Sequence, residues 1–207
     1  MDLLEELGVL SMLTPVPRGG VSHVCLPSTL VGMMHRGYPR EFRLRFGADT
    51  EWLRDFWRDF LARPQTRAWA QSHPFLANKG VADLVTTIPC TLHLDAGPCT
   101  KRQSCCCISW TSMLAQGGEK VSVCFCSAFY FYFMFLFNEV TQFLCYSFLK
   151  GNPDADAEAL QMLLADFDAL ATGLLDGNPI AREGRKIWKF VLMVAKAMPF
   201  GPKPNIK

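Results

Sequence analysis

The chain has 207 residues, of which 21 are Lys or Arg and 19 are Asp or Glu. This length suits one domain or two small ones, and a net charge of +2 excludes both a protein that binds nucleic acid by charge alone and an acidic tail. Nine cysteines are an odd number, and acids stand at the N-terminus where a secretory signal needs basic residues. We therefore expect buried, reduced cysteines and no complete disulfide framework.

The first part of the chain has weak periodicity. Leucines at helical spacing among acids predict a short helix over residues 1–13, and the Pro- and Gly-rich residues 14–40 predict a loop. In residues 41–46 apolar residues alternate with arginines, which is the two-residue period of a half-exposed edge strand.

Residues 49–63 carry the clearest helical pattern. Asp49 or Thr50 can cap this helix, and Pro64 ends it. Its apolar stripe predicts core packing, because arginines alternate with aspartates on the other face instead of forming the basic groove of a single-strand reader. The stripe consists of Trp52, Leu53, Phe56, Trp57, Phe60 and Leu61.

Two more helices are predicted near the C-terminus. Residues 152–176 have acids in the first turns and leucines on one side, and Gly177 supplies a stop. Residues 182–197 form a basic amphipathic pattern, which fits a membrane surface, a partner's groove or an ordinary solvated face.

Two short strands are predicted at residues 88–95 and 105–110, joined through a turn at residues 96–98. His93 and Asp95 are two residues apart, so on a strand they share a face and could share a metal or a proton. The alternative is a His and an Asp that satisfy backbone groups of the turn. Asp166 or Asp168 in the later helix could in principle complete a carboxylate site with Asp95, and no other catalytic residue is nominated.

Four side chains of the same region could bind zinc. Thiolates and imidazoles are the ligands that zinc prefers, although the segment has no C-x2-C pair. The candidate ligands are Cys90, His93, Cys99 and Cys106. We expect no organic cofactor.

An apolar block lies between Lys120 and Lys150, and Glu139 is its only charge. Its uncharged run from Val121 to Asn138 has 18 residues, near the lower limit for a membrane-spanning helix. Basic residues before the block place the N-terminal part of the chain in the cytoplasm. The sequence thus predicts a lipid bilayer as the partner of residues 121–149.

The composition of the block allows two other interpretations. It holds eight of the 16 Phe and three of the four Tyr, but only three Leu. Phe, Ser, Cys and Tyr all have codons that begin with T, so a retained intron translated in frame would have this composition. An ordinary buried core helix is the remaining interpretation.

The segment IPCTLHLDAGPCTKRQSCCCISWTSMLAQGGEK resembles a multi-copy, functionally uncharacterised family of dinoflagellate proteins with an L-H-x-D-x-G-P motif. The resemblance covers about residues 63–120 and 163–197, whereas residues 121–149 have no counterpart. The opening strands of that family are similar to ribonuclease-H-like DDE transposase domains, which implies a mobile-element origin. The matching residues are His93, Asp95, Gly97, Pro98, Ser109, Trp110 and Ser112.

Together these patterns predict an α+β, mostly helical chain with a small antiparallel sheet element near residues 88–110 and one long apolar, transmembrane-type helix. The expected regions are a soluble part at 1–120, the apolar segment at 121–149 and a helical part at 150–207. The expected function is a non-catalytic, membrane-associated chain. The alternative is a degenerate, transposase-related fragment in the nucleus or cytoplasm.

Overall fold

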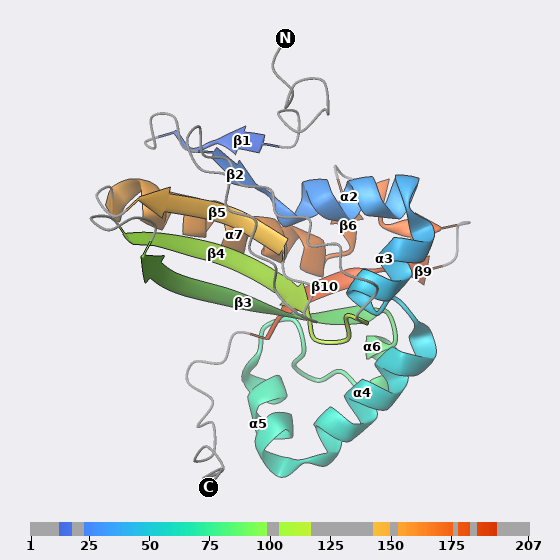
Figure 1. The fold of residues 1–207 in the computed structure, drawn as a ribbon. Coiled ribbons are helices and arrows are strands. Elements are labelled where there is room, and N and C mark those ends of the chain that lie inside the picture. Colours follow the sequence, from blue (N-terminus) through green and yellow to red (C-terminus); the bar gives the residue numbers. More distant parts are fainter. Residues whose placement is uncertain are drawn as a thin grey trace, which may run out of the picture.

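The computed structural model describes residues 13–17, 23–98, 104–116, 143–149, 153–175, 178–182 and 186–193. They form an α+β fold around one four-stranded sheet, with helices on both sides of it (Figure 1).

The sheet has the strand order β10-β3-β4-β5. Strand β3 (Thr87–Pro98) pairs antiparallel with β4 (Ser104–Ser112), and β4 pairs antiparallel with β5 (Phe143–Leu149). Strand β10 (Lys189–Leu192) lies parallel to β3 on its other side. The antiparallel pair expected near residues 88–110 is therefore present, within a larger mixed sheet.

In Figure 1 helix α7 (Pro153–Ala171) runs behind β5, and helices α2 (Pro27–Gly37) and α3 (Pro39–Phe46) lie at the upper right of the sheet. Helices α4 (Thr50–Ala62), α5 (Pro64–Ser72) and α6 (Val81–Leu84) lie below it. The short hairpin of β1 (Leu13–Pro15) and β2 (His23–Cys25) lies near β5, and two further two-stranded pairs precede β10. These pairs join β6 (Leu174–Leu175) to β7 (Asn178–Pro179), and β8 (Ala181–Arg182) to β9 (Lys186–Ile187).

Helix α4 forms as the sequence predicts. The Asp49 carboxylate accepts hydrogen bonds from the backbone N–H groups of Glu51 and Trp52, which is N-terminal capping. Trp57 is fully buried, and its Nε1–H donates to the Thr87 carbonyl oxygen at 2.8 Å. The aromatic stripe is thus a core face that joins α4 to the start of β3.

Aromatic side chains fill the space between the sheet and the helices α3 and α7. Phe46 stacks on Trp110 with ring centroids 5.5 Å apart, and Trp110 meets Phe167 edge-on at 5.2 Å. Phe190 packs edge-on against Phe46 at 5.3 Å. Such pairs contribute about 0.5–1.5 kcal/mol each beyond area burial. The cluster therefore joins β4, β10, α3 and α7 in one core.

The expectation of one long apolar helix over residues 121–149 is wrong for its last part. Residues 143–149 are strand β5, which pairs with β4 through backbone hydrogen bonds. Among the described residues no helix is both long and apolar enough to span a membrane. Residues 121–142 lie outside the described residues, so the bilayer and intron hypotheses stay predictions for them.

The predicted strand at 41–46 is also wrong, because this segment belongs to helix α3. Pro39 occupies the first position of the helix, where its missing N–H costs nothing. Phe42 and Phe46, four residues apart, are both buried. Gly47 then ends the helix with a left-handed φ of 61°, and a Cβ there would collide with the Leu114 side chain.

The Pro- and Gly-rich residues 14–40, predicted to be a loop, contain part of β1, all of β2 and helix α2. Pro27 is at the beginning of α2 and so initiates the helix. The predicted helix at 1–13 falls almost wholly outside the described residues.

The predicted basic helix at 182–197 is wrong, because its described residues are the strands β8, β9 and β10. Lys189 N–H donates to the Thr86 carbonyl oxygen at 2.9 Å, which begins the parallel pairing with β3. Phe190 and Val191 are both buried although they are adjacent. A strand buried on both faces has no two-residue alternation, so its sequence can imitate a helix.

Helix α7 confirms the prediction of a helix after residue 152, but it stops at Ala171, before the predicted stop at Gly177. Gly173 follows it with a φ of 81°. Leu163, Phe167 and Leu170 are buried, whereas Leu164 is 39% exposed, so the apolar face is narrower than predicted.

Candidate functional site

The candidate residues His93 and Asp95 lie in the second half of β3. In the backbone register His93 is opposite Ser109, and Asp95 is opposite Cys107. Strand alternation places His93 and Asp95 on one face of the sheet, as the sequence predicts. The turn predicted at residues 96–98 is instead the end of the strand, which continues to Pro98.

Three of the four candidate zinc ligands lie on described strands, and they fall on two faces of the sheet. Cys90 is three residues from His93 on β3, so alternation places it on the opposite face. Cys106 is opposite Ala96 and therefore shares the face of Cys90. Cys99 lies outside the described residues, and the four-ligand set stays a prediction.

Cys90 has the surroundings of a structural cysteine. Its side chain is fully buried, and Sγ lies 3.8 Å from the Ile88 carbonyl oxygen. Burial raises the pKa of the Cys90 thiol well above its ordinary value. The thiolate, which is the form that binds zinc, is therefore strongly disfavoured.

Strand β10, the parallel neighbour of β3, supplies no acid near Asp95 within its described residues. Strand β10 has the sequence KFVL, and it pairs with residues 87–90 of β3. Asp95 is five residues beyond Cys90, the last β3 residue in that pairing. Among the described residues, the neighbours of Asp95 in the sheet thus come from β4 alone.

Two acids of α7 are the other sequence candidates for a carboxylate cluster, and both have structural environments. Asp166 Oδ2 accepts a hydrogen bond from the backbone N–H of Ser28, at the beginning of α2. Burial, and next the Asp166 charge, raise the pKa of the nearby Cys25 thiol to about 11. Asp168 is exposed and acts electrostatically on His73, below the sheet.

The residues that the structure describes do not fit the metal ions that a DDE-type site implies. Two-metal cleavage needs several carboxylates around ions about 4 Å apart. Over the described residues, no three His, Cys, Asp or Glu side chains gather in a way that could hold a metal ion. The Ser28 contact also turns Asp166 toward α2.

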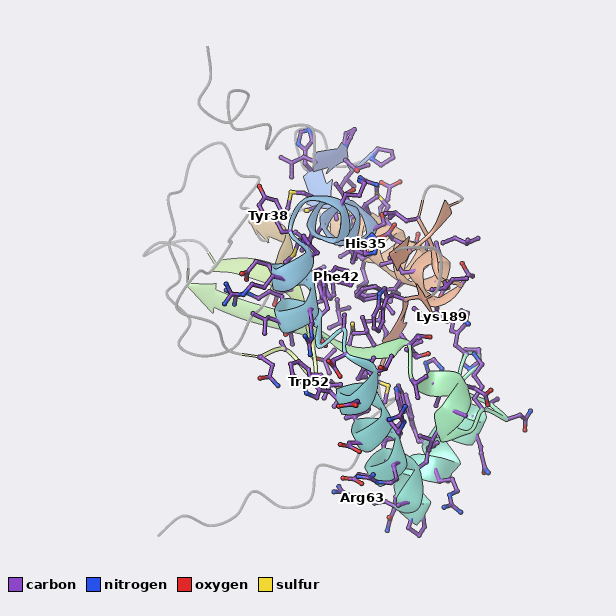
Figure 2. All side chains as sticks on the ribbon, turned by 90° about the vertical axis from the view of Figure 1, so that its right-hand side faces the viewer. His35, Tyr38, Phe42, Trp52, Arg63 and Lys189 are labelled. Atoms are coloured by element: carbon purple, nitrogen blue, oxygen red, sulfur yellow. The ribbon has the colours of Figure 1, made fainter. Side chains whose placement is uncertain are left out.

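The structure brings out residues that the sequence reasoning missed. Tyr38, between α2 and α3, is 58% exposed, and Figure 2 shows it at the outer end of that corner. His73, at the end of α5, contacts the Leu192 carbonyl oxygen of β10 across 119 residues of chain. Only the Pro after Tyr38 and the Ser-His-Pro turn hinted at these positions.

Comparison of the chain with protein-family models, with curated proteins and with solved structures finds no match.

Proposed function

We propose that this chain is a transposase-related protein with a ribonuclease-H-like core that does not cleave nucleic acid. The observation that carries the proposal is the strand order. A three-stranded antiparallel meander, β3-β4-β5, is followed by helix α7 and by β10, which returns parallel to the first strand. The first two strands and a later helix are what the resemblance of the opening strands implies, and the third strand and the parallel return of β10 add to them.

The packing supports the same arrangement. Helix α7 contacts β10, and Phe167 of α7 packs against Trp110 in the middle strand of the meander. A helix between β5 and β10 is the connection that parallel pairing with β3 requires, because a tight turn cannot join parallel strands.

Strand β5 gives the last part of the apolar block a role in this core. Residues 143–149 form the third strand of the meander and pair with residues 105–110. An insertion of intron origin would therefore have to lie within residues 121–142. Residues 143–149 cannot belong to such an insertion, because β5 is part of the sheet of the proposed core.

The positions of the described acids support the proposed loss of cleavage. Asp95 is beyond the pairing with β10, β10 has no acid, and Asp166 binds the Ser28 N–H. One carboxylate cannot hold two metal ions or balance the charge that develops in phosphodiester hydrolysis.

The test combines a fold readout with a cleavage assay on the full chain. Nuclear Overhauser contacts between residues 189–192 and 87–90 should show the parallel register. The same sample, incubated with Mg²⁺ or Mn²⁺, should leave supercoiled DNA and an RNA–DNA hybrid intact. Nicking that is lost in Asp95→Asn and kept in Asp59→Asn, a change on the exposed face of α4, would overturn the proposal. An antiparallel or absent β3–β10 pairing would overturn the proposed core.

A further inference from the structure

His73 joins the helices below the sheet to edge strand β10. It is the C-terminal cap of α5, and its ring Nε2 lies 3.1 Å from the Leu192 carbonyl oxygen. Leu192 is the last residue of β10, and the next N–H, of Met193, donates to the Cys90 carbonyl oxygen at 2.7 Å. One imidazole therefore connects α5 to the end of the parallel strand pair.

The second ring nitrogen of His73 is also engaged. The backbone N–H of Phe75 donates to Nδ1 at 3.2 Å. Nδ1 must therefore carry the lone pair, and Nε2 must carry the hydrogen that the Leu192 carbonyl accepts. Both contacts are satisfied together only by the neutral imidazole with hydrogen on Nε2.

The His73 carbonyl oxygen holds the following turn. It accepts hydrogen bonds from the N–H groups of Leu76 and Ala77 at 3.1 and 2.9 Å. Leu76 is 2% exposed, so this turn anchors a core side chain. A change in the hydrogen bonds of the His73 ring therefore acts on the turn that carries buried Leu76.

We propose that His73 is an acid-sensitive clasp: its Nδ1 closes the turn at residues 73–77 only while the imidazole is neutral, and its Nε2–H holds this turn to β10. Protonation of Nδ1 replaces its lone pair with an N–H, which then faces the N–H of Phe75. The Phe75 hydrogen bond is lost and the two donors repel each other, so the turn opens at Phe75, while Nε2–H still donates to the Leu192 carbonyl oxygen. This inference does not depend on the proposed ancestry of the chain.

Burial and the surrounding charges together shift the pKa of His73. Burial lowers the pKa of His73 below its ordinary value. The Leu192 carbonyl and Asp168 of α7 oppose that shift, and Lys79 adds to it. Burial, and next the charge of Lys189 of β10, lower the pKa of Lys79, whereas Asp83 of α6 raises it. Figure 2 shows Lys189 just above the helical layer that carries His73.

Amide hydrogen exchange measures the clasp directly. The protection factor of the Phe75 amide, corrected for the intrinsic exchange rate, should fall between about pH 7.5 and about pH 5. If His73 ionises at its ordinary pKa only when the turn is open, the fall is at most about 30-fold at pH 5. The Leu53 amide in α4 should keep its protection, which separates local opening from acid unfolding.

His73→Gln is the informative variant, because a glutamine amide can donate and accept without titrating. Its Phe75 protection should not change with pH, whereas His23→Gln on β2 should keep the wild-type dependence. If His73→Gln does not fold, imidazole NMR of the wild-type chain decides. An Nε2–H tautomer that titrates below about 6.5 supports the clasp. Titration at or above that value, or pH-independent protection of wild-type Phe75, would overturn it.

Discussion

The carboxylate of Asp166 accepts a 2.7 Å hydrogen bond from the backbone N–H of Ser28, which is 138 residues away in the chain. The first N–H groups of a helix have no partner within it, and a negative charge at that end also interacts favourably with the helix dipole. Helix α7 thus caps α2, whose own N-cap residue, Leu26, has no side-chain acceptor. The contact fixes these two helices against each other.

Replacing Asp166 with Ala should lower the free energy of unfolding by about 1–2 kcal/mol, because the Ser28 N–H loses a charged acceptor. Urea denaturation followed by circular dichroism measures the change. Asp168→Ala, an exposed position on the same helix, should cost less. Equal effects of the two substitutions would contradict the capping role.

Trp57→Ala should destabilise the chain by about 3–5 kcal/mol, because it opens a cavity in the core and leaves the Thr87 carbonyl without its donor. Trp57→Phe should fall between wild type and Ala. Trp52→Ala is the matched control, since Trp52 is half-buried under the Arg43 guanidinium. Thermal midpoints of the three variants give the order, and an unchanged midpoint in Trp57→Ala would mean that the stripe faces a partner.

Gly47→Ala should destabilise the chain by about 1–3 kcal/mol, because φ is 61° there and the added Cβ meets Leu114. Gly37→Ala, at the last position of α2, has open space around its added Cβ and should change stability little. The comparison uses denaturant midpoints. Similar losses at both glycines would show that the left-handed conformation of Gly47 is not what limits substitution.

Asp49 should make stability depend on pH in the acid range. Burial raises its pKa, but the Glu51 and Trp52 N–H groups and Arg43 outweigh this effect and hold the pKa below its ordinary value. The folded state then binds fewer protons than the unfolded state, so the contribution is complete above the unfolded pKa of about 4 and is lost as pH falls through the folded value. Asp49→Ala should cost about 1 kcal/mol near neutral pH and progressively less in acid. A constant difference across acid pH would refute this linkage.

Elements whose stabilising contacts are local could be predicted from the sequence. Helix α4 has its cap, its apolar stripe and its stop within residues 49–64, and strands β3 and β4 have the composition of buried strands beside a turn signal. His93 and Asp95 could likewise be placed on one strand face, because alternation depends only on the backbone.

Elements decided by distant partners could not be predicted. Leu44 and Phe46 alternate as in a strand, but burial of Phe42 and Phe46 against Trp188, Trp110 and Phe190 selects a helix for residues 39–46. Residues 189–192 have helical spacing, yet β3 offers them a parallel edge.

The tertiary structure also decided what the acids and the histidine contact. Nothing near Asp166 in the sequence points to Ser28, and nothing near His73 points to Leu192. Local patterns record the backbone conformation that a segment prefers by itself. Hydrogen bonds across more than a hundred residues exist only once the core has packed, because burial of the apolar faces brings those groups together.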